Sequence, residues 1–188
     1  MPDKFFLSVG SIIQRKNLLT VCKALYELKN IINIPLVVIG TGHGYKEEVK
    51  RYIADKGLTD RIIFLNDRPQ AQSSRSFVTG EDFPAIYQQA LCMIYPSIFE
   101  GFGLPVLEAL QSSLPVITSN LSCLPETGGN AAYYVDPLSV KEMASAIANI
   151  ANDGMLRKDM IKRGDEYAKY FMQEKCAERV MKVYTSLF

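Results

Sequence analysis

Two glutamates, Glu100 and Glu108, have the residue type and the spacing for chemistry on a polar ligand. An apolar run precedes Glu100, a turn punctuated by Gly101 and Gly103 follows it, and a helix is predicted to begin near Leu104. Glycines allow a backbone to approach a ligand closely, and the free N–H groups at a helix start attract negative charge. Glu100 then lies in the loop and Glu108 about one turn inside the helix, so we expect both carboxylates to face one ligand from different heights.

Each glutamate also has an interpretation that requires no ligand. Glu100 would be a favourable charge near a helix start, and Glu108 would lie on a solvated helix face. Each alternative is strong for its single residue and weaker for the two glutamates taken together with the glycine turn.

Two basic residues, Arg15 and Lys16, follow the first apolar run and precede a predicted helix. Cations there oppose the helix dipole at a cost of about 0.3–1 kcal/mol each. Their side chains are either solvated at a loop tip or converge, with helix amides, on a diphosphate. The sequence contains no Asp-x-Asp pair to hold a metal ion. We therefore expect no metal and no cofactor, with cationic side chains and helix amides meeting the charge of a bound diphosphate.

The pattern of apolar residues predicts the elements that position these side chains. Six short apolar runs lack apolar/polar alternation, as expected for strands buried on both faces of a parallel sheet. Amphipathic segments between them predict helices, which gives a doubly wound α/β domain that binds ligands at the carboxyl ends of its strands. The runs cover residues 5–9, 36–39, 62–65, 91–95, 116–118 and 132–135. Helices are predicted over residues 17–30, 45–56, 82–89, from about 104, and over 139–150, 155–170 and 173–186.

Two local patterns add detail. Ser139 and Glu142 form an S-x-x-E capping box that opens the first of three C-terminal helices. The stretch 66–80 is long and polar, and we interpret it as either disordered or functional.

The composition limits the classes of protein. The chain has 188 residues, 48% of them hydrophobic, which suits one domain with a sizeable core. Its formal net charge of +1 argues against a nucleic-acid binder. No apolar run is long enough to cross a bilayer, and no signal-peptide pattern is present. Four cysteines without a C-x-x-C pair, beside a single histidine, indicate small core residues in a reducing compartment, so we expect a cytoplasmic protein.

Glu100 and Glu108 together form an E-x7-E motif within the run Glu-Gly-Phe-Gly-Leu-Pro-Val-Leu-Glu-Ala. This run resembles the C-terminal domain of GT-B-fold retaining glycosyltransferases of family 4, the glycosyl transferases group 1. The resemblance extends in the family's order over nearly the whole chain. It includes Ser8-Val-Gly10, Arg15-Lys16-Asn17, Gly40-Thr-Gly42, Phe83-Pro-Ala-Ile-Tyr87, Pro115-Val-Ile-Thr-Ser119-Asn, Leu124-Pro-Glu126 and Val135-Asp-Pro137.

The resemblance implies a Rossmann-like domain over residues 1–188, the donor-binding half of a GT-B fold, whose N-terminal acceptor domain is absent from this chain. It implies transfer of a hexosyl group, with retention, from a UDP- or GDP-linked sugar to a glycan or lipid-linked acceptor, in cell-surface polysaccharide assembly. The chain alone is then expected to be inactive. Peripheral association with the inner face of the membrane would occur through the missing domain.

The resemblance also assigns roles to residues. Arg15 and Lys16 would hold the donor diphosphate, Glu100 would contact the transferred sugar, and Glu108 would accept hydrogen bonds from the ribose. Many family members carry an arginine where this chain has Ser11, and we infer that Arg15 supplies that charge. The other implied donor-binding residues are Gly10, Ser11, Gly40, Gly42, Leu65, Asn66, Gly101, Phe102, Gly103 and Leu104, with the backbone near residues 65 and 66 bordering the base.

Other functions remain as alternatives. The chain would also suit a nucleotide-sugar-binding module or subunit with no transferase activity of its own. A nucleotide-sugar epimerase is disfavoured by the E-x7-E motif. A dinucleotide-binding domain is disfavoured because no G-x-G-x-x-G follows the first predicted strand.

Overall fold

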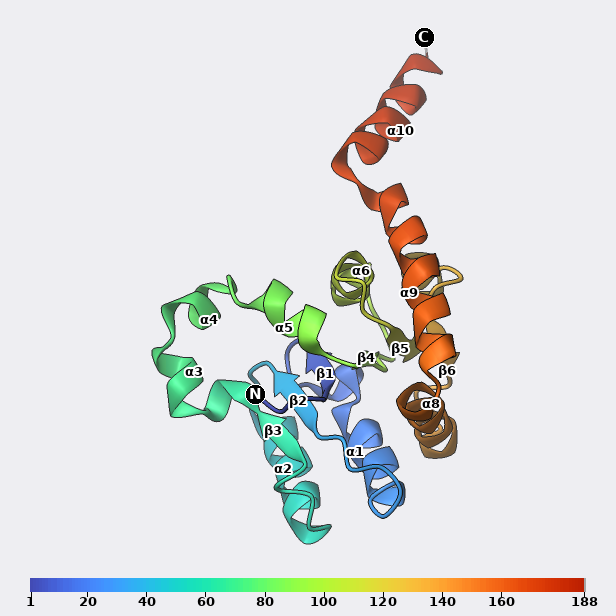
Figure 1. Ribbon diagram of the computed structural model, residues 1–188. Coiled ribbons are helices and arrows are strands. Elements are labelled where there is room, and N and C mark those ends of the chain that lie inside the picture. The colour runs from blue at the N-terminus through green and yellow to red at the C-terminus, as the bar shows by residue number, and fades with distance from the viewer. Residues whose placement is uncertain (188) are drawn as a thin grey trace.

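Six parallel strands form one sheet in the computed structural model, which describes residues 1–187 (Figure 1). Their order is β3-β2-β1-β4-β5-β6, and every pair of neighbours is parallel. The predicted doubly wound fold is confirmed, and each strand lies within one residue of its predicted bounds. The strands are β1 (Phe6–Val9), β2 (Leu36–Ile39), β3 (Ile62–Phe64), β4 (Cys92–Tyr95), β5 (Val116–Ser119) and β6 (Tyr133–Val135).

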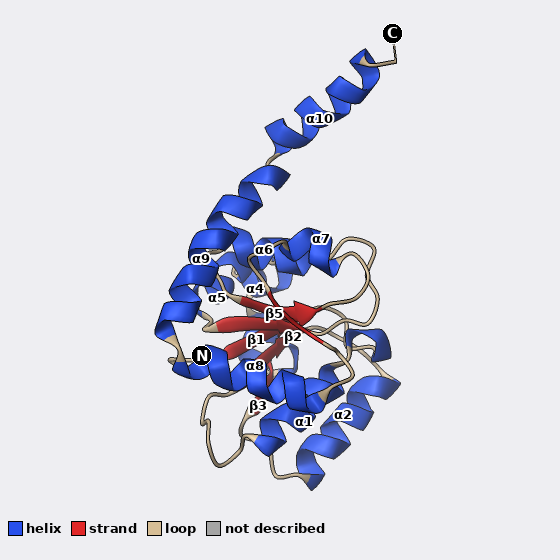
Figure 2. Ribbon diagram, turned by 90° about the vertical axis from the view of Figure 1, so that its right-hand side faces the viewer, coloured by secondary structure: helices blue, strands red, loops and turns tan. Residues whose placement is uncertain are grey.

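Helices cover both faces of the sheet (Figure 2). One face packs against α1 (Leu18–Glu27), α2 (Gly44–Asp55) and α8 (Val140–Asn152). The other packs against α5 (Phe83–Gln89), α6 (Leu104–Gln111), α7 (Leu124–Gly128) and the end of α9 (Gly154–Ala168). Alternate residues of each strand supply the two cores, so that Phe6 faces one layer and Leu7 the other.

The polar stretch 66–80 is ordered into short helices, so the alternative of disorder is wrong. It forms η2 (Leu65–Asp67), α3 (Pro69–Ser73) and α4 (Arg75–Thr79). Only two side chains, Ala71 and Phe77, are buried within these helices. Ser74 accepts a hydrogen bond from the Phe77 N–H at the start of α4, so polar residues here cap helices rather than solvate a coil.

The predicted C-terminal helices are present. Ser139 caps α8 by accepting from the Glu142 N–H, but the Glu142 carboxylate accepts from the Asp136 N–H at 2.9 Å and thus closes the preceding loop. After α9 come η3 (Lys169–Phe171) and α10 (Gln173–Thr185). All residues of α10 are exposed, and both views show it extending away from the sheet (Figures 1 and 2).

Among residues 1–187, no helix has both the length and the apolar character needed to cross a membrane.

Candidate functional site

The loops after β1 and β4 meet at the carboxyl edge of the sheet. The two strands are neighbours, yet β1 leads through η1 (Gln14–Lys16) to α1 on one face and β4 leads to α6 on the other. In sheets of this kind, ligands bind beside two neighbouring strands whose following connections run to opposite faces of the sheet. Arg15 and Lys16 lie in the first loop and Glu100 in the second, so the fold brings together residues about 85 positions apart.

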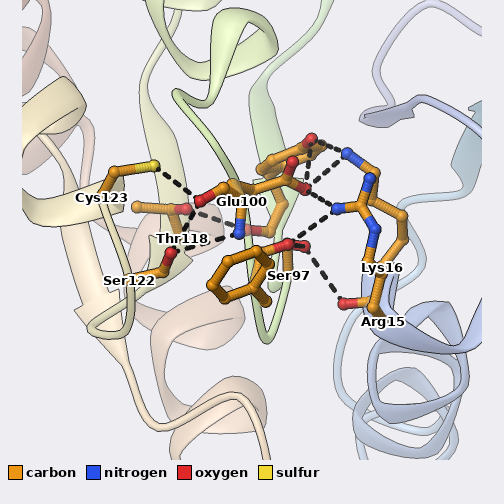
Figure 3. A network of polar contacts seen from close by, with 9 residues as sticks. Arg15, Lys16, Ser97, Glu100, Thr118, Ser122 and Cys123 are labelled. Carbon is orange, nitrogen blue, oxygen red and sulfur yellow. Dashed lines mark hydrogen bonds and ion pairs between the residues drawn. The ribbon is translucent and has the colours of Figure 1, made fainter.

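Glu100 is the centre of a charged cluster (Figure 3). Its Oε1 lies 2.5 Å from the Nζ of Lys16 and 2.9 Å from the Nη1 of Arg15. The same oxygen accepts a hydrogen bond from the Tyr95 hydroxyl at 2.9 Å, and Lys16 also donates to that hydroxyl. Two cations therefore share one carboxylate oxygen, and the cluster of these three charges carries an excess of one positive charge.

The surroundings keep the Glu100 carboxylate ionised. Its side chain is 9% exposed, and this burial by itself raises the pKa. Hydrogen bonds from Lys16, and also from Ser97, Arg15 and Tyr95, outweigh the burial and lower the pKa to about 2. Glu100 is thus a permanent negative charge at neutral pH, suited to accept hydrogen bonds and unsuited to donate a proton.

The backbone of Glu100 is tied to the loop after β5. Its N–H donates to the Ser122 hydroxyl at 3.2 Å, and its carbonyl accepts from that hydroxyl at 2.8 Å and from the Cys123 thiol at 3.2 Å (Figure 3). On the opposite side, the Ile98 N–H donates to the Arg15 carbonyl at 2.8 Å. The glutamate loop is therefore held between the loops after β1 and β5.

Glu108 is exposed on α6, as the solvated-face alternative predicts, but it is not without a partner. Its Oε2 accepts a hydrogen bond from the buried Tyr87 hydroxyl at 2.8 Å. Burial raises the pKa of Tyr95 well above its usual range, and the negative charges of Glu100 and then Glu108 raise it further. Glu100 bonds Tyr95 and Glu108 bonds Tyr87, so each motif glutamate accepts a hydrogen bond from a different tyrosine.

The turn before α6 contains one glycine that its surroundings require and one that they do not. Gly103 has a φ of 93°, and a Cβ there would lie 2.8 Å from Leu124. A Cβ on exposed Gly101 would meet nothing within 4 Å, so packing does not explain a glycine at that position. Phe102 and Leu104 are also exposed, which leaves this turn accessible from solvent.

Close packing within the fold explains why Gly40 and Gly42, after β2, are glycines. A Cβ on Gly40 would lie 1.9 Å from the Gly10 carbonyl oxygen, and one on Gly42 would lie 2.3 Å from the Ile12 carbonyl oxygen. The loops after β1 and β2 therefore pack backbone against backbone. Asn66 accepts a hydrogen bond from the Gly40 N–H at 2.7 Å, which joins the end of β3 to the same layer.

Ser11 and Leu65, two of the predicted donor-binding residues, make no contact with the charged cluster. Ser11 is exposed on the loop after β1, and it is Arg15 that reaches Glu100. Leu65 begins η2 instead of ending β3, and it is half-buried beside the core.

Tyr95 and Tyr87 are site residues that the sequence reasoning did not assign. Tyr95 ended a predicted strand and Tyr87 ended one of the runs that carry the family resemblance, yet neither was given a role, and each donates its hydroxyl to a motif glutamate. Tyr95 carried a usable signal, because a tyrosine at the last position of a parallel strand places a polar atom at the ligand-binding edge. For Tyr87 the only signal was its place in the run Phe83-Pro-Ala-Ile-Tyr87, and its contact with Glu108 depends on where α5 lies in space. Within residues 1–187, no group of three acidic, cysteine or histidine side chains could hold a metal ion.

Comparison with known proteins gives a consistent result. The family model of glycosyl transferases group 1 matches residues 1–167. O-antigen chain mannosyltransferase B of Escherichia coli is 31% identical over 186 residues, covering 97% of this chain and 46% of that protein. O-antigen chain mannosyltransferase RfbU of Salmonella typhimurium is 31% identical over 148 residues, covering 79% of this chain and 38% of that protein. The chain thus spans less than half the length of these curated relatives.

Solved structures share the fold. The C-terminal domain of a glycosyl transferase group 1 family protein (LpcC) from Francisella tularensis is 25% identical with a TM-score of 0.74, covering 90% of this chain and 86% of that one. Anabaena HepE, solved in complex with UDP and glucose, is 18% identical with a TM-score of 0.81, covering 98% of this chain and 49% of that one.

Proposed function

Because this chain belongs to the glycosyl transferases group 1 family, we propose that its charged cluster binds the diphosphate of a nucleoside-diphosphate sugar. The observation that carries this proposal is the convergence of Arg15 and Lys16 on one oxygen of Glu100. This contact lies at the carboxyl ends of the neighbouring strands β1 and β4. The pair has one positive charge more than Glu100 neutralises. A diphosphate supplies the missing negative charge and accepts the strong, charge-assisted hydrogen bonds of both cations.

The chemistry follows from where charge develops. When the glycosidic bond to the phosphate breaks, negative charge grows on the departing nucleoside diphosphate, and Arg15 and Lys16 stabilise it without a metal ion. Glu108 accepts hydrogen bonds from the ribose, and Glu100 contacts the transferred sugar. The open backbone at Gly101 lies against the sugar hydroxyls and the phosphates. The reaction proceeds with retention at the anomeric carbon.

The relatives support a proposal for the donor and the acceptor. The two relatives named above are mannosyltransferases of O-antigen chains, and HepE was solved with UDP and glucose. We therefore propose a UDP- or GDP-linked hexose as donor and a glycan or lipid-linked acceptor in cell-surface polysaccharide assembly.

We further propose that residues 1–188 form the donor domain of a two-domain enzyme. This rests on the chain spanning less than half of its relatives, and on the likeness to a separately solved C-terminal domain. The acceptor then binds to the other domain, which works in the cytoplasm or at the inner face of the membrane. By itself this chain binds donor and transfers no sugar.

Calorimetry on the purified chain tests the proposal, with UDP, GDP, uridine and guanosine as ligands in the presence and absence of EDTA. We expect one diphosphate to bind more tightly than its nucleoside, with equal affinity in EDTA. No diphosphate binding at all would refute the proposed site, and a loss in EDTA that Mg²⁺ restores would refute the metal-free mechanism. Efficient sugar transfer by this chain alone would refute the two-domain proposal.

A further inference from the structure

Asn17 occupies an unusual position directly after the two cations. It separates η1 from α1, is buried, and has the left-handed backbone conformation, with φ 58° and ψ 35°. Asparagine is one of the few residues besides glycine that tolerate this conformation. At a helix start its side chain would normally accept from a backbone N–H of the first turn, yet Asn17 makes no such bond.

The Asn17 amide instead joins three loops. Its Nδ2 donates to the Pro137 carbonyl at 2.5 Å and, at the longer distance of 3.4 Å, to the Pro96 carbonyl. Its Oδ1 accepts from the Thr20 hydroxyl at 2.8 Å, which fixes the orientation of the amide. Pro96 begins the loop after β4, and Pro137 lies in the loop after β6. One side chain therefore fastens the end of η1 to two other loops at the ligand-binding edge.

We propose that Asn17 is a positioning residue, which holds Arg15 and Lys16 in place for the diphosphate. This inference rests on the proposed function. The turn that carries both cations is anchored on one side by the Arg15 carbonyl, which accepts from the Ile98 N–H and the Ser97 hydroxyl. Asn17 anchors the other side. These two anchors together hold the turn so that both cations lie against the Glu100 loop.

The side-chain chemistry selects an amide. Two N–H bonds serve two carbonyls, and one oxygen serves a hydroxyl. Glycine keeps the left-handed backbone and removes the cross-link. Aspartate keeps the acceptor for Thr20, has no donor, and places a negative charge beside two carbonyl oxygens. Asn17→Gly and Asn17→Asp therefore both remove the two donated hydrogen bonds, and only Asn17→Asp keeps the acceptor for Thr20.

The test measures affinities of the purified chain for the tighter-binding diphosphate, UDP or GDP, and for the matching nucleoside. We expect Asn17→Gly and Asn17→Asp to weaken diphosphate binding about tenfold, the effect of one lost hydrogen bond, and to leave nucleoside binding unchanged. In a background that carries both Arg15→Ala and Lys16→Ala, we expect the same substitutions to weaken diphosphate binding by less than about a further twofold, because their effect passes through the two cations. Thr20→Val, which leaves both Asn17 donors in place, is the matched control.

Several outcomes would overturn the inference. Equal losses for diphosphate and nucleoside would show a general structural role. A full additional loss in the background that carries both Arg15→Ala and Lys16→Ala would show that Asn17 does not act through the two cations. If Asn17→Gly unfolds, Asn17→Asp supplies the comparison, and unfolding of both would make Asn17 a determinant of the fold instead. Absence of diphosphate binding by the unmodified chain would refute the proposed function, whereas the other outcomes refute only the role of Asn17.

Discussion

A single carboxylate oxygen facing two cations makes the site dependent on pH. The pKa of Glu100 is lowered in the folded chain from 4.5 to about 2. Ionised Glu100 therefore stabilises the fold fully above pH 4.5, and this contribution is lost as the pH falls toward 2. Glu100→Gln has no such contribution, so we expect its free energy of unfolding to approach that of the unmodified chain as the pH drops through this range. The pKa of Asp67 is also lowered, but Asp67 is present in both chains, so its effect cancels in the difference between their free energies of unfolding. A pH-independent difference would contradict the assignment.

Lys16 should matter for both binding and stability. Lys16→Ala is expected to weaken diphosphate binding by roughly 1.5–3 kcal/mol, one to two decades in affinity, with nucleoside binding unchanged. Its side chain is only 14% exposed and bonds Glu100 and Tyr95, so we also expect a loss of about 1–3 kcal/mol in the free energy of unfolding. Lys175→Ala, in an exposed pair with Glu178, is the control and should change neither quantity in calorimetry or urea denaturation.

Glu108, unlike Lys16, should matter equally for diphosphate and nucleoside binding. Glu108→Ala is expected to weaken nucleoside and diphosphate binding equally, by about tenfold, because its proposed partner is the ribose. Tyr87→Phe should produce a smaller loss in the same direction, because Tyr87 only orients the carboxylate. Unchanged nucleoside affinity for Glu108→Ala would remove Glu108 from the ribose role.

The sequence was enough to identify these residues as candidates for the site, but it did not predict their contacts with one another. Arg15, Lys16 and Glu100 were each predicted to reach a ligand, and the structure shows that they also bind one another. Residue type and spacing cannot reveal such a pairing, because it depends on β1 and β4 being neighbours. The same applies to the cross-link from Asn17 to Pro137, since the two residues lie 120 positions apart.

At the level of elements, apolar runs were sufficient for the strands, because β2, β4 and β5 are buried along their whole length and the other three strands in part. The stretch 66–80 was harder, because its helices are short and bury only Ala71 and Phe77. Such helices depend on neighbouring elements for their stability, and no periodic pattern marks them. The final helix α10 was predicted from the sequence, and the structure shows that none of its side chains is buried.

One contact between elements can be tested through a glycine. A Cβ on Gly129, after α7, would lie 2.3 Å from the Tyr167 ring of α9. The φ of Gly129 is also positive, at 54°. We expect Gly129→Ala to lower the free energy of unfolding by about 1–3 kcal/mol, because α9 must shift to admit the methyl group. Gly44→Ala, where nothing lies within 4 Å, should change it by less than about 0.5 kcal/mol. Equal effects in urea denaturation would contradict the packing argument.

At the scale of the whole molecule, α10 presents a row of apolar side chains to solvent. Val180, Met181, Val183 and Tyr184 are each more than half exposed. Such an exposed apolar row is typical of an interaction surface. Because α10 buries no side chain in this chain, removal of residues 173–188 should change the free energy of unfolding by less than about 1 kcal/mol. Calorimetry should show unchanged diphosphate affinity, and a larger loss of stability would show that α10 supports the sheet.

The thiol of Cys123 offers a practical means to observe the site. It donates to the Glu100 carbonyl and is half-buried, whereas Cys22 and Cys92 are fully buried, and burial raises the pKa of the Cys22 thiol to about 12. Cys176 is the exposed competitor. A chain with Cys176→Ser would therefore accept a small fluorophore at Cys123 alone. The label would lie beside the Glu100 loop and serve as an optical sensor of donor binding, independent of any acceptor or coupled assay.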